Sequence, residues 1–105
     1  MIINIEDYLS TEVFKSRQEL AEETGLSERM VRRKISDLKL IKPVIFNSNI
    51  KGYRLAKDID SMSKEELITE KNLIQHSIND LLARRKVFNQ QLHSYIAYLK
   101  LAEKF

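Results

Sequence analysis

The sequence predicts a mainly α-helical protein with one small β-hairpin, in which short N-terminal helices and the hairpin are followed by one long C-terminal helix. Its length of 105 residues suits one small domain with an appended helix. Because the chain has only 2 Gly and 1 Pro, few residues favour turns and helix should dominate. The clearest run of strand-forming residues lies within residues 44–55, which predicts the hairpin there.

Composition narrows the possible functions. The chain has no Cys, which excludes disulfides and thiolate metal sites. No apolar run approaches the roughly 20 residues needed to span a bilayer, and the first residues lack the features of a signal peptide, so we expect a cytoplasmic protein with no membrane partner. His76 and His93 have no second ligand at metal spacing, and no carboxylate is paired with a His or Ser in a catalytic pattern. We therefore expect no enzyme, no metal and no cofactor.

Capping residues predict where the N-terminal helices begin and end. Apolar residues at spacings of three and four predict a short first helix within residues 2–11. Ser16 and Glu19 have the spacing of a capping box, which opens a second helix. Gly25 can adopt the left-handed conformation that ends helices, so the second helix should stop there. Two residues later, Ser27 is a suitable cap for a third helix.

The third helix, about residues 27–39, precedes the predicted hairpin, about residues 44–55. The helix has an apolar stripe at spacings of four and three, and its basic residues lie away from that stripe. Pro43 ends helical structure before the hairpin. The apolar stripe consists of Val31, Ile35 and Leu38.

The positive charge of the chain is concentrated in one segment. Residues 1–28 carry two basic and seven acidic residues, a net charge of −5, whereas residues 29–57 carry nine basic residues and one acidic residue, a net charge of +8. Residues 58–105 sum to zero. A phosphate-binding surface requires such a concentration, and an ordinary solvated face is the alternative interpretation.

The C-terminal part is predicted to be one long helix that joins copies of the chain. Residues 58–62 form a polar joint, and Ser63 with Glu66 gives a second capping box. No Gly or Pro follows Gly52, so residues 63–105 fit one helix with a heptad-like apolar stripe. Because an isolated helix cannot bury this stripe, we expect a coiled-coil homo-oligomer, most simply a homodimer, with a helix of another protein as the alternative partner. The predicted oligomerisation residues are Leu67, Ile74, Ile78, Leu81, Leu82, Phe88, Leu92, Tyr95, Ile96 and Leu99.

Residues 16–38 combine a small residue where two helices cross, a glycine in the turn, a serine cap and apolar residues facing the core. These are Ala21, Gly25, Leu26, Ser27 and Val31. Together with the later Gly-Tyr-Arg-Leu segment, residues 52–55, the pattern resembles the winged helix-turn-helix of bacterial regulators, particularly the small domains typified by the biotin repressor and the DeoR-type regulators. The resemblance covers residues 1–57, about half of the chain. Nothing after residue 60 could build the family's large ligand-binding or enzymatic domain, so no effector is implied.

The resemblance implies binding of double-stranded DNA, with residues 27–39 as a recognition helix in the major groove and residues 44–55 as a wing on the backbone or in the minor groove. Glu28 could instead favour its helix terminus through the dipole, and Arg54 could pair with an acid of the first helix. The candidate DNA-binding residues are Ser16, Arg17, Ser27, Glu28, Arg29, Arg32, Arg33, Lys39, Lys42, Asn49, Lys51 and Arg54.

The expected function is that of a sequence-specific transcriptional regulator acting as a homo-oligomer. One alternative is a phage or plasmid protein that binds DNA for replication, packaging or partition. Another alternative is an adaptor protein that uses the long helix to bind a different protein.

Overall fold

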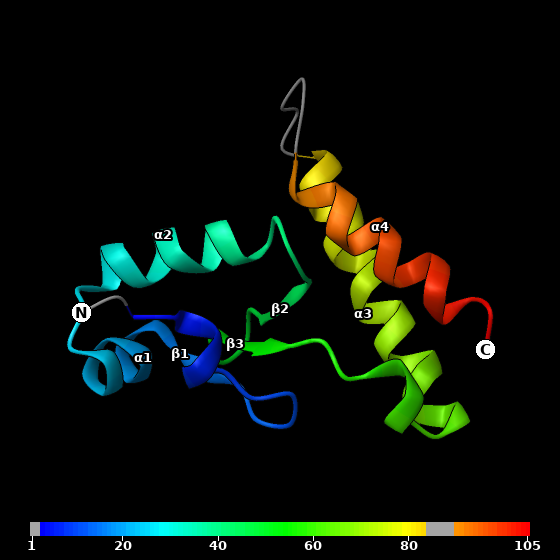
Figure 1. The fold of residues 1–105 in the computed structure, drawn as a ribbon, viewed down its shortest axis with the longest axis horizontal. Helices are drawn as coiled ribbons and strands as arrows, with labels where there is room; N and C mark the ends of the chain where they lie inside the picture. Colours follow the sequence, from blue (N-terminus) through cyan, green and yellow to red (C-terminus); the bar gives the residue numbers. More distant parts are fainter. Residues whose placement is uncertain (1–2, 84–89) are drawn as a thin grey trace.

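The computed structural model describes residues 3–83 and 90–105. This part of the chain is mainly helical and contains one three-stranded antiparallel sheet (Figure 1). Its elements follow in the order 3₁₀ helix η1 (Ile5–Tyr8), β1 (Lys15–Ser16), α1 (Arg17–Thr24), α2 (Glu28–Leu38), β2 (Val44–Asn47), β3 (Gly52–Leu55), 3₁₀ helix η2 (Ile59–Ser61), α3 (Lys64–Ala83) and α4 (Gln91–Ala102).

Helices α1 and α2 have the caps that the sequence predicts. The Ser16 hydroxyl accepts a hydrogen bond from the Glu19 N–H at 3.1 Å, and the Glu19 carboxylate accepts one from the Ser16 N–H at 3.2 Å. Gly25 ends α1 with a φ of +77°, a conformation that costs glycine little. The Ser27 hydroxyl then accepts a hydrogen bond from the Met30 N–H at 3.2 Å and opens α2. Hydrogen bonds between residues close together in the chain, with the backbone freedom of Gly25, therefore define these helix ends.

The first helix is shorter than predicted. The sequence predicts helix within residues 2–11, but the described part forms only the 3₁₀ helix Ile5–Tyr8. The reason is a competing contact, because the Ser10 carbonyl accepts a hydrogen bond from the Leu55 N–H at 2.8 Å and so holds the chain against β3. The Ser10 hydroxyl also accepts the Glu12 N–H at 2.9 Å and turns the backbone away from helix.

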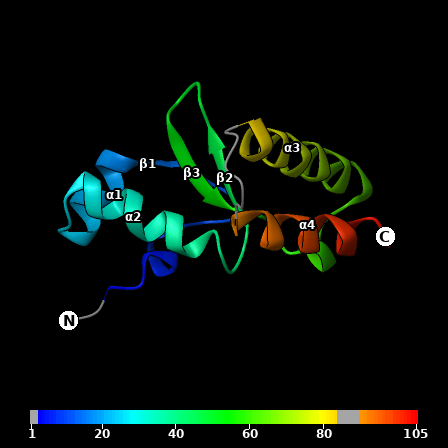
Figure 2. The ribbon, with the colours of Figure 1, turned by 90° about the horizontal axis from the view of Figure 1, so that it is seen from above.

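The predicted hairpin is confirmed as β2 and β3, which pair with Val44 opposite Leu55. β1 adds to the other side of β3, giving the order β1–β3–β2. The sheet separates two cores and lies between α1 with α2 and α3 with α4 (Figure 2). Val44 faces the core formed with α1 and α2, and Ile45 faces the core formed with α3 and α4, because successive side chains of a strand point to opposite faces. The N-terminal core consists of Ile5, Leu9, Leu20, Val31, Ile35, Leu38 and Val44, and the C-terminal core of Ile45, Ile74, Ile78, Leu81 and Tyr95.

The prediction of one long C-terminal helix is wrong. α3 and α4 are separate helices that lie side by side and run in opposite directions (Figure 1). The apolar stripe needed a partner helix, and the chain supplies that partner itself, together with the second face of the sheet. The predicted oligomerisation residues that are buried within the chain are Leu67, Ile74, Ile78, Leu81 and Tyr95.

The remaining predicted oligomerisation residues differ in exposure. Leu92 and Leu99 are partly buried against the C-terminal core. Leu82 and Ile96 are exposed, with 60% and 38% of their surface accessible. Phe88 lies outside the described residues. Most of the stripe is therefore used for folding, and only a smaller apolar surface is left on this helical pair.

Hydrogen bonds hold α4 against the N-terminal half. The buried Tyr95 hydroxyl donates to the Val44 carbonyl at 2.7 Å and accepts from the Val44 N–H at 3.1 Å. The Ser94 hydroxyl donates to the Lys39 carbonyl at 2.5 Å, at the end of α2. Because Tyr95 satisfies both backbone groups of one residue, it fixes the start of β2 against α4.

Tyr95→Phe tests this contact. The variant leaves two buried backbone groups of Val44 without a partner, so we expect a loss of about 1–3 kcal/mol in the free energy of unfolding, measured by urea denaturation. Tyr8→Phe, which removes the same hydroxyl from a partly buried tyrosine of the N-terminal core, is the control and should cost much less. Equal losses in the two variants would contradict the role assigned to the Tyr95 hydroxyl.

Candidate nucleic-acid interface

The exposed face of α2 carries the densest group of predicted site residues. Val31 and Ile35 face the N-terminal core, so helical geometry directs the arginines between and before them to solvent. Ser27, at the cap, is also exposed. The exposed predicted residues within α2 are Glu28, Arg29, Arg32 and Arg33. The structure thus brings three guanidinium groups and one carboxylate together along one accessible helix face.

The tip of the β2–β3 hairpin presents the predicted wing residues. Asn49 and Lys51 are both exposed in the loop between the strands. The Asn47 side chain accepts a hydrogen bond from the Asn49 N–H at 3.0 Å, which tightens this loop. Lys51 has a φ of +51°, in the left-handed region that a non-glycine residue adopts mainly in turns. The hairpin tip is therefore a short turn that presents the Asn49 amide and the Lys51 ammonium group to solvent.

Three predicted residues are engaged in contacts within the fold. Ser16 accepts the Glu19 N–H with its hydroxyl oxygen and donates its own N–H to the Glu19 carboxylate, so that N–H is not available to a phosphate. Lys42 forms an ion pair with Glu6 of η1. The backbone carbonyl of Lys39 accepts the Ser94 hydroxyl, which places Lys39 where α2 meets α4.

A cleft of about 840 Å³ lies between α2, the hairpin and the helical pair. Arg32 and Lys39 line it from α2, and Arg17 lines it from the start of α1. Residues from α3 and α4 form part of its lining, among them His76 and Gln91. His76 and Gln91 are not among the predicted site residues, because one continuous helix would carry them away from α2.

The comparisons with protein-family models, curated proteins and solved structures gave no match. Among the described residues, no group of three or more His, Cys, Asp or Glu is arranged to hold a metal ion. In the same part of the chain, no helix is both long and apolar enough to cross a bilayer.

Arg54 is not part of the exposed basic surface, contrary to the prediction. Only 5% of its surface is accessible, and its guanidinium forms a two-pronged ion pair with Glu70 of α3, with both N···O distances 2.7 Å. The guanidinium also lies 5.1 Å from the centre of the Phe14 ring. The alternative prediction, that Arg54 pairs with an acid of the first helix, is wrong as well, because its partner is Glu70. Tyr53 and Leu55 pack on the N-terminal core, so the alternation of β3 directs Arg54 to the opposite face, towards α3.

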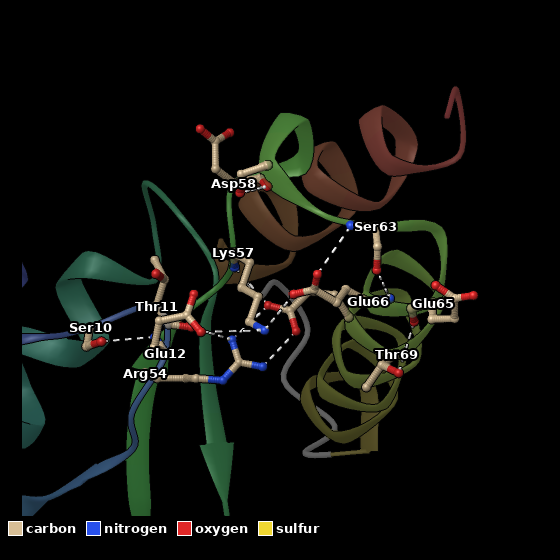
Figure 3. A network of polar contacts seen from close by, with 12 residues as sticks. Ser10, Thr11, Glu12, Arg54, Lys57, Asp58, Ser63, Glu65, Glu66 and Thr69 are labelled. Carbon is tan, nitrogen blue, oxygen red and sulfur yellow. Dashed lines mark hydrogen bonds and ion pairs between the residues drawn. The ribbon is translucent and has the colours of Figure 1, made fainter.

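The Arg54–Glu70 pair is the centre of a polar network that links β3 to α3 (Figure 3). Glu70 also accepts the Lys57 N–H at 2.8 Å, and the Lys57 ammonium pairs with Glu66 at 3.2 Å. Glu66 closes the predicted capping box with Ser63 at the start of α3. The Lys57 carbonyl accepts the Tyr98 hydroxyl at 2.5 Å, so α4 joins the same network.

Burial and hydrogen bonding oppose each other in setting the pKa of Glu70. Burial alone would raise the pKa of this carboxyl, but the hydrogen bonds from Arg54 and from the Lys57 N–H outweigh burial and hold the pKa below its usual value of 4.5. Burial, followed by the negative charge of Glu70, raises the pKa of Tyr98 to about 12, so its hydroxyl remains a donor. The network thus favours a charged carboxylate and a neutral phenol.

Glu70→Gln tests the network, with the exposed Glu65→Gln as control. Removing one partner leaves the Arg54 charge buried and unpaired, so we expect a loss of about 3–5 kcal/mol in the free energy of unfolding at pH 7. Because the pKa of Glu70 is lower in the folded state, its stabilisation is complete above about pH 4.5 and is lost as the pH falls through the folded value. Denaturant titrations at neutral and acidic pH measure both effects.

The wild type should therefore lose more stability on acidification than Glu70→Gln does. The pKa of Glu66 is also lowered, mainly by its hydrogen bond with the Ser63 N–H, and this contribution is common to both proteins. A Glu70→Gln variant as stable at pH 7 as Glu65→Gln would refute the importance of the pair.

Proposed function

We propose that this chain binds double-stranded DNA as a winged helix-turn-helix, with α2 in the major groove and the β2–β3 hairpin as the wing. The observation that carries the proposal is the exposed row of Arg29, Arg32 and Arg33 on α2. This helix follows a tight turn, and the β2–β3 hairpin lies in the same half of the chain. An α-helix fits the major groove of B-DNA, and arginine can donate two hydrogen bonds to one guanine. Glu28, at the N-terminus of the same helix, could accept from cytosine or favour the helix dipole.

The backbone of DNA would be bound by basic groups around this helix. Arg17 and Lys39 line the neighbouring cleft, and Lys51 with Asn49 stands at the hairpin tip. Phosphate contacts of this kind position a protein on the duplex without reading its sequence. The proposal assigns specificity to the arginines of α2 and general affinity to the other groups.

The effective basic surface is narrower than the sequence suggests. Nine basic residues fall within residues 29–57, but Arg54 is buried with Glu70, and Lys42 and Lys57 form ion pairs within the fold. The arginines of α2 thus make up a larger share of the charge that remains for a partner. This favours binding centred on α2 over a diffuse electrostatic surface.

The proposed biological role is transcriptional regulation, because the resemblance to bacterial winged-helix regulators is carried by the same residues. Replication, packaging or partition of phage or plasmid DNA would use the same contacts. Selection of bound sites from random duplexes gives the recognised sequence, and a palindromic site would indicate two heads acting on paired half-sites.

Arg32→Ala combined with Arg33→Ala tests the proposal. Each arginine that makes a good two-bond contact with a base contributes about 1–3 kcal/mol of discrimination, so the double variant should lose at least about tenfold in affinity for the selected duplex. Gel-shift titration or fluorescence anisotropy measures the loss. Binding of the wild type should also weaken as salt is raised, because phosphate contacts release counterions.

Lys64→Ala combined with Lys100→Ala is the matched control. Like the double arginine variant, it removes two positive charges, but from exposed positions on α3 and α4. It should leave the affinity for the duplex nearly unchanged. Affinity that is independent of salt, or an equal loss in the two double variants, would refute binding through α2.

We also propose that the chain acts as a homodimer through apolar side chains left exposed on the helical pair. Leu82 and Ile96 belong to the predicted stripe, and Ile68 and Leu101 are exposed on the same two helices. Sedimentation of the wild type should give twice the mass of one 12.4 kDa chain, and Leu82→Glu with Ile96→Glu should give a monomer. A monomeric wild type at all concentrations would contradict self-association and leave the proposal of DNA binding intact.

A further inference from the structure

The end of α3 and the start of α4 form a second wall of the cleft beside α2. His76, Ser77 and Asp80 of α3 line the cleft together with Arg32 and Lys39 of α2. In Figure 1, α4 begins near the C-terminal end of α2, and both helices of the pair extend beyond α2 on that side. Anything that lies along the exposed face of α2 towards its C-terminal end therefore meets this wall.

Hydrogen bonds fix the wall in place. The Gln91 amide donates to the Ser36 hydroxyl at 2.9 Å and to the Ser36 carbonyl at 3.0 Å. Ser94 and Tyr95, within the following turn of α4, bond to backbone groups at the end of α2 and the start of β2. The distance between the two walls is thus set by the fold, and the cleft does not need to form on binding.

The charges that line the cleft suit an anionic chain. Arg17, Arg32 and Lys39 contribute three positive charges from the N-terminal half, and Asp80 is the one acidic residue among the described lining residues. His76 is exposed on the opposite wall and carries a ring N–H donor in every protonation state. At about 840 Å³ the cleft has the size of a small-ligand pocket, so it could admit part of one nucleic-acid strand but not a whole duplex.

We propose that one phosphodiester strand of the bound duplex runs through this cleft, between Lys39 at the end of α2 on one wall and His76 of α3 on the other. This inference rests on the proposed function, because a helix in the major groove has the DNA backbone on either side of it. The helical pair is then part of the DNA-binding surface as well as a support for the sheet. It adds affinity without adding sequence discrimination, since phosphates are the same at every base pair.

The test is a charge series at His76, measured by fluorescence anisotropy with the selected duplex and with an unrelated duplex. His76→Glu should weaken binding of both duplexes by about tenfold, and His76→Lys should tighten both and make binding more dependent on salt. The ratio of the two affinities should stay the same. A gain of affinity in His76→Lys cannot result from misfolding, so the test does not depend on the stability of His76→Glu.

Gln75→Glu and Gln75→Lys are the matched controls. Gln75 is the preceding residue of α3, is exposed and lies outside the cleft lining. If the His76 and Gln75 variants change affinity equally, the strand does not run through the cleft and the inference is overturned. If Arg32→Ala with Arg33→Ala still weakens binding of the selected duplex at least about tenfold in that case, the proposed function stands, whereas a wild type that binds no duplex refutes both.

Discussion

The buried ion pair between Arg54 and Glu70 determines how the two halves of the chain fit together. A guanidinium on the second face of the sheet must be paired, because an isolated charge in that position would cost several kcal/mol. Glu70 supplies the partner and ties α3 to β3 at 2.7 Å. With α3 fixed, α4 packs beside it and reaches α2 through Ser94 and Gln91. The wall of the cleft beside α2 therefore depends on a contact on the far side of the hairpin.

Local features of this fold can be predicted from the sequence, because each depends on residues close together in the chain. Ser16 with Glu19, Gly25 and Ser27 are correctly identified as caps, since a cap involves only the first or last turn of its helix. The return of α4 along α3 could not be predicted in the same way. A heptad stripe shows only that an apolar face must be covered, and it does not say whether another chain or the same chain covers it.

The same distinction applies to the candidate site. Helical periodicity is enough to place Arg29, Arg32 and Arg33 on the exposed face of α2, since Val31 and Ile35 have to face the core. The burial of Arg54 cannot be predicted in this way, because its partner Glu70, 16 residues later, is brought near only by the packing of α3 on the sheet. The position of His76 beside the cleft depends on the same packing. Charge counted along a sequence thus overestimates a binding surface until the ion pairs within the fold are known.

Binding of duplex DNA by the exposed face of α2 and the hairpin tip can be followed residue by residue. Amide chemical-shift mapping of the isotope-labelled protein during titration with a selected duplex does this, and a chain of 12.4 kDa suits the method. We expect the largest changes in residues 28–39 and 48–51, with further changes near His76. Little change is expected at the far ends of the helical pair, near Lys64 and Lys100. An unchanged spectrum, or changes confined to those far ends, would contradict DNA binding through α2 and the hairpin.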